Sequence, residues 1–172
     1  RYYSDLYYKV LVTPDTMIVS QQNIGRVITL DPAGMSCFDP LGDQYATVSI
    51  DNNLDLLNFD RCTGEFSVKE LINVPTSYAA FGAAFSASGR YLYVCTNVNV
   101  FQFDTWASPI FSSIDTVATW DTLYSPFATY FFMEDLASDN KIYITTYGGT
   151  DKMHVINNPD IAGAGCNLIQ NQ

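Results

Sequence analysis

The sequence is short of basic residues: 8 Lys and Arg stand against 18 Asp and Glu, which gives a formal net charge of −10. Proteins bind nucleic acids and anionic lipid surfaces through clusters of Lys and Arg. The chain also has no apolar run near the roughly 18 residues that a membrane-spanning helix needs. We therefore expect neither nucleic-acid binding nor insertion into a membrane.

Signatures of catalysis and metal binding are scarce. The one histidine, His154, has no second histidine with which to build a metal site, and we expect it to be structural. The Gly-x-Ser-x-Gly turn of serine hydrolases and the Cys-x-x-Cys pair are both missing. Asp51, Asn53 and Asp55 copy the first ligands of a calcium loop, but the glycine and glutamate that must follow are absent. We expect a solvated hairpin turn there, and no catalytic residue, cofactor or metal.

Helix signals are nearly absent too, because no window carries apolar residues at helical spacing between a cap and a stop. Three of the 18 acidic residues are glutamate, and the rest are aspartate. Aspartate favours turns, since its short side chain bonds nearby backbone N–H groups. With 48% hydrophobic and 15% aromatic residues, the chain can bury a core. This composition predicts an all-β protein of many short strands.

The sequence does contain a repeat, in which a bulky apolar residue is followed four positions later by Gly or Asn. The three copies lie at 37–42, 84–89 and 135–140. An apolar strand that ends in a turn follows each copy. From Phe59 to Phe103 is 44 residues, and from Phe103 to Ile156 is 53 residues. A repeat of about 40 to 50 residues matches a four-stranded propeller blade.

Alternating polarity and turn residues predict four strands in each unit. In the first complete unit, these strands cover 34–38, 44–50, 54–59 and 66–74. Two earlier strands, at 6–12 and 17–24, are the outer pair of a preceding unit. The sequence therefore predicts an all-β partial β-propeller over 1–172, with about three and a half four-stranded blades of a seven-bladed ring. We divide it into 1–31 for the two outer strands and 32–77, 78–127 and 128–172 for one blade each.

Four cysteines leave three full pairings open. Cys37 ends one strand and Cys62 follows the end of another strand in the same unit. These two residues are therefore the candidate disulfide pair if the compartment is oxidising. Cys95 lies in an apolar strand, where a free cysteine usually behaves as a small buried hydrophobic residue.

Exposed aromatic residues supply the candidate binding residues, because Trp and Tyr are common anchors in binding sites. We single out Trp106, Trp120 and Tyr124. The last two belong to the longest irregular stretch, 120–127. This stretch is either an ordinary crossover between blades or a loop elaborated for binding.

Four segments, above all the Phe-Asp-Arg-Cys-Thr-Gly run at 59–64, resemble the propeller of large secreted Bacteroidota surface proteins. The others lie at 85–94, 136–144 and 158–166. Such propellers are similar to WD40-like and lactonase-like seven-bladed propellers, and they often precede a gliding-motility-type or type IX secretion sorting domain. The resemblance implies a secreted or cell-surface location. No sorting domain is present, and a ring needs about twice as many units. We therefore expect a fragment whose remaining blades lie on the same longer polypeptide or on another chain.

Several functions fit this fold. We favour a non-catalytic module that acts as a scaffold or adhesion surface, with a protein or a glycan as ligand. The alternative is half of a lactonase-like hydrolase or lyase whose catalytic residues surround the channel, and a weaker alternative is a carbohydrate-binding module. A cluster of Asp, Glu, Asn and His at the channel end of the inner strands favours the enzyme, whereas an apolar channel favours the scaffold.

Overall fold

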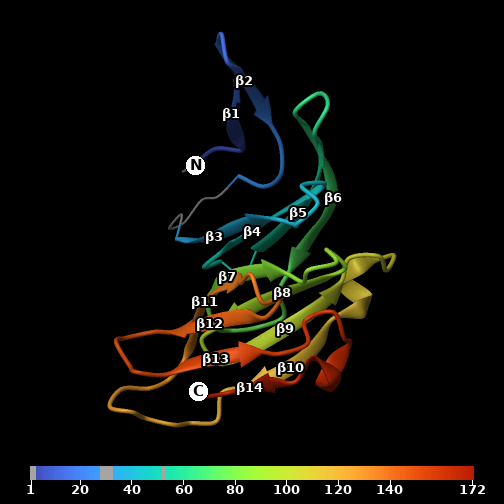
Figure 1. Ribbon diagram of the computed structural model, residues 1–172. Helices are drawn as coiled ribbons and strands as arrows, with labels where there is room; N and C mark the ends of the chain where they lie inside the picture. Colours follow the sequence, from blue (N-terminus) through green and yellow to red (C-terminus); the bar gives the residue numbers. More distant parts are fainter. Residues whose placement is uncertain (1–2, 28–32, 52) are drawn as a thin grey trace.

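The computed structural model describes residues 3–27, 33–51 and 53–172, which form one two-stranded and three four-stranded antiparallel sheets (Figure 1). The two-stranded sheet consists of β1 (Leu6–Val12) and β2 (Met17–Asn23). The first four-stranded sheet consists of β3 (Gly34–Phe38), β4 (Gln44–Ser49), β5 (Asn53–Asp60) and β6 (Glu65–Asn73). The second consists of β7 (Ala80–Phe85), β8 (Tyr91–Thr96), β9 (Asn99–Asp104) and β10 (Asp115–Thr119). The third consists of β11 (Phe131–Leu136), β12 (Ile142–Thr146), β13 (Met153–Ile156) and β14 (Leu168–Ile169).

Two short 3-10 helices, η1 (Ile110–Ser113) and η2 (Gly163–Cys166), precede the last strands of the second and third sheets. In each four-stranded sheet the strands pair in chain order, so the first strand and the last strand form its two edges. The first strands lie together, because β3 packs against β7 and β7 packs against β11. No helix among the described residues is long and apolar enough to cross a membrane.

This arrangement confirms the predicted all-β architecture of three and a half blades. The three meanders are complete blades, and the β1–β2 hairpin is half of one. The expected strands agree with the observed ones to within a residue or two in the first complete blade. The proposed division of the chain into units, and the seven-bladed ring, stay predictions.

The core lies in two layers between neighbouring sheets. One layer, between the first and second four-stranded sheets, includes Leu92 and Val94 of β8. The other, between the second and third sheets, includes Tyr93 and Cys95 of the same strand. Successive side chains of a strand point to opposite faces, so β8 supplies both layers and every residue in it is buried. Burial of each large apolar side chain contributes about 1.5–3 kcal/mol.

The repeated sequence pattern corresponds to one turn that recurs in all three four-stranded sheets. Gly42 and Gly89 both have a φ of 73°, and Asn140 has a φ of 62°. In each turn the backbone N–H of this residue donates to the carbonyl three residues earlier. Glycine and, less often, asparagine tolerate this left-handed conformation, which explains why these residue types occupy the fourth position after the bulky residue.

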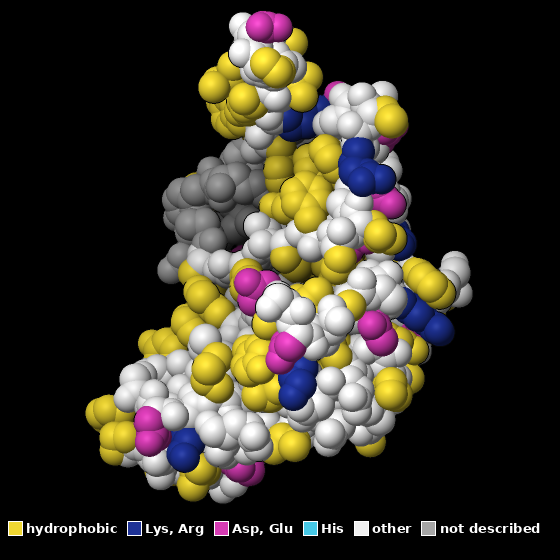
Figure 2. Space-filling view, viewed as in Figure 1, with side chains coloured by type: hydrophobic (Ala, Val, Ile, Leu, Met, Phe, Trp, Pro, Cys, Tyr) yellow, Lys and Arg dark blue, Asp and Glu magenta, His cyan; other side chains and the backbone are white. Residues whose placement is uncertain are grey.

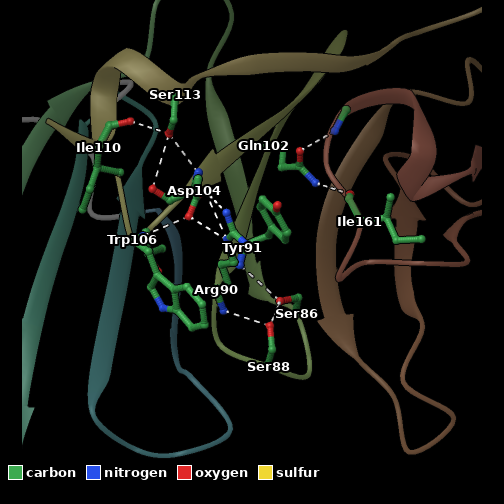
Figure 3. Close-up of polar contacts among 12 residues, drawn as sticks. Ser86, Ser88, Arg90, Tyr91, Gln102, Asp104, Trp106, Ile110, Ser113 and Ile161 are labelled. Atoms are coloured by element: carbon green, nitrogen blue, oxygen red, sulfur yellow. Dashed lines mark hydrogen bonds and ion pairs between the residues drawn. The ribbon is translucent and has the colours of Figure 1, made fainter. Parts of the chain in front are cut away.

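Buried amide side chains connect each sheet to the backbone of the next. The Nε2 of Gln44 donates to the carbonyl of Gly89 at 3.0 Å. Gln102 repeats this contact one sheet later, where its Nε2 donates to the carbonyl of Ile161 at 2.9 Å (Figure 3). Each such bond contributes about 1 kcal/mol. Because both partners are specific backbone positions, these bonds fix how adjacent blades align.

Ring contacts, an ion pair and hydrogen bonds join the β1–β2 hairpin to the first four-stranded sheet: Tyr7 packs on Phe66, and Lys9 pairs with Glu65 at 2.6 Å. Arg26, just after β2, donates to Asp55 of β5 twice: from Nη1 at 3.0 Å and from the backbone N–H at 2.8 Å. Gln22 of β2 bonds both the N–H and the carbonyl of Phe66. Asp55 is 2% exposed, so the expected solvated turn is wrong at this position. The carboxylate lies inside the sheet because Arg26 neutralises it.

Replacing Asp55 with alanine should lower the free energy of unfolding by about 3 kcal/mol, because it leaves the guanidinium of Arg26 without its charged partner. The measurement is urea unfolding followed by circular dichroism. Asp15→Ala, at an exposed position in the β1–β2 turn, is the control and should change stability by less than about 0.5 kcal/mol. Equal losses in the two variants would show that the Arg26–Asp55 pair does not anchor the hairpin.

Candidate ligand-binding site

A pocket of about 730 Å³ opens at one end of the second and third four-stranded sheets. Four connections meet there: 74–79, 97–98, 120–130 and 147–152. We call this end of the molecule the loop face; its two long connections, β10–β11 and β12–β13, extend to the left in Figure 1. Five aromatic side chains line the pocket: Tyr78, Phe81, Trp120, Tyr130 and Tyr147. Its volume falls in the range of about 300–1,000 Å³ that is typical of small-molecule sites.

Two of the inner strands carry β-bulges beside this pocket. The register of β7 against β8 shifts at Phe81, and the register of β11 against β12 shifts between Phe131 and Glu134, around Phe132. A bulge redirects the side chain at the extra residue. The two redirected rings, Phe81 and Phe132, lie 5.1 Å apart between centroids. The loop-face ends of these inner strands are therefore aromatic.

The connection between β10 and β11 holds the Trp120 ring in a fixed position. Its Nε1 donates to the Thr129 hydroxyl at 3.2 Å. The ring centroid lies 4.3 Å from that of Tyr130 and 5.7 Å from that of Tyr124. Thr122, which also lines the pocket, has a φ of 66°. A β-branched residue rarely adopts this conformation, and such strain, of order 1–3 kcal/mol, clusters at ligand sites.

His154 of β13 contacts the connection between β10 and β11 through its side chain. Its side chain is fully buried, the backbone N–H of Asn171 donates to Nδ1 at 3.3 Å, and Nε2 lies 3.0 Å from the carbonyl of Thr129. Nδ1 is therefore the acceptor, and Nε2 carries the hydrogen. Burial lowers the pKa of His154, which keeps the ring neutral. Both ring nitrogens serve the fold, as the structural interpretation of this residue predicted.

The polar side chains of the pocket are all uncharged. They belong to Asn97, Asn99, Thr119 and Thr122. The side-chain amide of Asn99 donates to the hydroxyl of Thr119 at 3.2 Å. The side-chain amide of Asn97 makes no hydrogen bond within the described parts of the chain. Burial, together with the neighbouring Tyr124, raises the pKa of Tyr130. The pocket therefore offers amides and hydroxyls but no ionised group at neutral pH.

The three predicted binding aromatics lie at two different ends of the molecule. Trp120 lines the pocket, and the ring of Tyr124 packs against the ring of Trp120. Trp106 follows β9 at the opposite end of its sheet, where the residue is 67% exposed. There the guanidinium of Arg90 lies 5.1 Å from the Trp106 ring and also pairs with Asp104 at 2.7 Å (Figure 3). The structure thus brings together Trp120 and Tyr124 and separates them from Trp106.

Sequence reasoning missed four of the aromatic residues of the pocket: Tyr78, Phe81, Tyr130 and Tyr147. A signal for them exists in the sequence. In a meander the chain reverses after every strand, so every second connection lies at the same end of the sheet. The connections 74–79, 120–130 and 147–152 lie at the same end of their sheets, and each contains or adjoins an aromatic residue of the pocket. Counting the strand reversals would therefore have grouped these four aromatic residues with Trp120.

Cys37 and Cys62 are free thiols in this structure. Cys37 packs against the core between the first and second sheets, and burial raises its pKa to about 12. Cys62 is exposed in the turn between β5 and β6. The candidate disulfide does not form here, because one thiol faces the neighbouring blade and the other faces solvent.

One carboxyl group is buried without a partner. Glu134 of β11 is 1% exposed, and neither of its side-chain oxygens has a hydrogen-bond partner among the described residues. Burial raises its pKa to about 8, so it is mostly protonated at neutral pH. Glu134 does not line the loop-face pocket. Within residues 3–27, 33–51 and 53–172, no three His, Cys, Asp or Glu side chains are placed to hold a metal ion.

The sequence matches no protein-family model and no curated protein. Solved structures do share its fold. A protein from Lactobacillus plantarum is 20% identical, with a TM-score of 0.59, over 98% of this chain and 48% of that one. The dihydro-heme d1 dehydrogenase NirN, in complex with DHE, is 14% identical, with a TM-score of 0.58, over 88% of this chain and 32% of that one. A chain of a nidogen/laminin complex is 11% identical, with a TM-score of 0.53, over 96% of this chain and 58% of that one.

These structures are β-propellers, and at such identities they show the fold alone. The described chain is a set of propeller blades. It spans between 32% and 58% of the length of the three similar chains. Its pocket lies at the end of the blades where the connections between successive blades meet.

Glu134→Gln should remove a pH dependence of stability. An unfolded glutamate has a pKa near ~4.3, so between that pH and about 8 the folded state holds a proton that the unfolded state has lost. The free energy of unfolding of the native chain should therefore fall relative to the variant as pH rises from 5 to 8, on the order of 1 kcal/mol per pH unit. Urea unfolding at several pH values measures the difference.

His154 contributes a pH dependence of the opposite sign: its pKa is lowered in the folded state, so the free energy of unfolding rises as pH rises from 5 to 7. This contribution is the same in the native chain and in Glu134→Gln, so it cancels when the two free energies are subtracted. Asp151→Asn, at an exposed position, is the matched control and should leave the pH profile unchanged. A Glu134→Gln profile parallel to that of the native chain would mean that Glu134 is ionised in the folded state.

Proposed function

We propose that this chain is a non-catalytic β-propeller module of a secreted or cell-surface protein, where it acts as an interaction surface. The observation that carries the proposal is the aromatic pocket of the loop face. Loops held by a rigid scaffold are where such folds place binding sites, and Trp and Tyr are the usual anchors. Phe81 and Phe132 make the loop-face ends of their inner strands apolar, which supports the scaffold over the propeller enzyme.

The surface location rests on the resemblance of the 59–64 run to secreted Bacteroidota surface proteins. Secretion by the type IX route is part of the same proposal. One similar structure is a chain of a nidogen/laminin complex, which supports a protein as one kind of partner. The fold does not identify the ligand, which must be inferred from the side chains that line the pocket.

The β1–β2 hairpin supports the proposal that further strands complete the module. Six of its apolar side chains are between 52% and 68% exposed: Val10, Leu11, Val12, Met17, Ile18 and Val19. Hydrophobic side chains gather on this part of the surface in Figure 2. Within the described chain β1 pairs only with β2, so its other edge is open. A pocket of about 560 Å³, rich in Tyr and Phe, is lined jointly by the hairpin and the first four-stranded sheet.

Open strand edges and large apolar patches promote aggregation unless a partner covers them. We therefore include in the proposal that the remaining blades, on the same longer polypeptide or on another chain, cover this hairpin. In an ordinary blade, the second of two inner strands would pair with the edge that β1 leaves open, and the first would pair with the second.

The test is to label intact cells of the source with a membrane-impermeant amine reagent, recover the protein and measure its intact mass. The expected result is labelling from outside the cell, in a polypeptide or stable complex larger than the 19.2 kDa of this chain. A cytoplasmic protein serves as the control for cell lysis. Protection from the reagent would overturn the surface location, and recovery of a soluble 19.2 kDa monomer would overturn the proposal of additional blades.

A further inference from the structure

We infer that the loop-face pocket binds a neutral saccharide. This inference rests on the proposed function, since it names the ligand class of the same site. The aromatic rings, the uncharged polar groups and the charge of the chain each bear on it independently.

The rings are suited to the apolar faces of a sugar. A pyranose presents C–H groups on its faces, and these groups pack on the surface of an aromatic ring that is already fixed in place. The hydrogen bond to Thr129 and the contact with Tyr130 hold Trp120 in this way. Tyr147 contributes a second ring, which is supported edge-on by Phe132 at 5.2 Å. Two aromatic clusters thus line one concave site.

The polar groups are suited to the edges of a sugar. Each sugar hydroxyl both donates and accepts, and so does a side-chain amide, which offers two donor hydrogens and a carbonyl oxygen. Asn97 has this capacity unused within the described chain, and Thr122 presents a hydroxyl from a strained backbone position. The hydroxyl of Tyr130, whose pKa is raised, remains a donor at neutral pH. A purely apolar ligand would leave these groups unpaired, at a cost in binding.

The electrostatics select a neutral ligand. The side chains that line the pocket include no Lys, Arg, Asp or Glu, and the chain carries a net charge of −10, which disfavours anionic ligands. A quaternary ammonium ligand would use the aromatic rings but not the amides. A proline-rich peptide docks on aromatic grooves through its own rings, and it too would use the amides less fully. A short neutral oligosaccharide uses both sets of groups.

The experiment titrates the complete source protein, with the blades that accompany this chain, with neutral gluco-, galacto-, manno- and xylo-oligosaccharides and follows binding by tryptophan fluorescence and calorimetry. We expect saturable binding to at least one series. Tyr147→Ala and Asn97→Ala should each weaken this binding at least about tenfold, as expected for anchors in a pocket. Both positions are outside the buried core, so circular dichroism should show an unchanged fold.

Trp106→Ala, at the opposite end of the sheet, is the matched control and should leave the affinity unchanged. A sulfated or uronic-acid form of the same oligosaccharide should bind more weakly than the neutral form. Absence of binding to all four series at about 10 mM, a concentration that detects affinities weaker than 1 mM, would overturn the inference. Binding that Tyr147→Ala and Asn97→Ala leave unchanged would also overturn it.

Two further probes separate failure of the inference from failure of the proposed function. Acetylcholine and a proline-rich peptide are titrated into the same variants. If either binds in a Tyr147-dependent manner while the sugars do not, the saccharide inference is wrong and the interaction surface stands. If no probe binds and the labelled chain shows no saturable binding to source cells, both the inference and the interaction surface are wrong.

Discussion

The packing of the inner strands against one another is the constraint on which the rest of this structure depends. A four-stranded sheet of this composition has two apolar faces and cannot cover either of them by itself. β8 illustrates the solution: its alternate side chains fill the cores on both sides of the second sheet, and all six of its residues are buried. The hairpin of β1 and β2 shows the opposite case: among the described residues no inner strand pairs with it, and six of its apolar side chains are more than half exposed.

The same packing creates the loop face. Because the sheets lie side by side with the same topology, corresponding connections of neighbouring blades meet at one end. Bulges lie at Phe81 in β7, which lines the pocket that these connections form, and around Phe132 in β11, whose ring packs against Phe81 and Tyr147. The connection between β10 and β11 adds Trp120, which Thr129 holds in place above the buried His154. The pocket is thus a consequence of blade stacking combined with local irregularities in single strands.

Much of the fold could be predicted from the sequence, because the informative signals are local. The recurring Gly or Asn marks the same left-handed turn at Gly42, Gly89 and Asn140, and the alternation of polarity gave the strands. The site was less predictable, since it depends on contacts between distant residues. Asp55 was expected in a solvated turn, but it is buried with Arg26, 29 residues earlier in the chain. The positions of the bulges leave no clear trace in the sequence, because they arise from the register between two strands.

Hydrogen–deuterium exchange on the 172-residue chain tests the stacking of the blades most directly. Amides protected by packed sheets on both sides open only with global unfolding, whereas those of an uncovered hairpin open locally. The stacking therefore predicts that β8, which pairs on both sides and is buried throughout, exchanges most slowly among the strands and that β1 and β2 exchange fastest. Protection of the hairpin equal to that of β8, or exchange of β7 as fast as that of the hairpin, would contradict it.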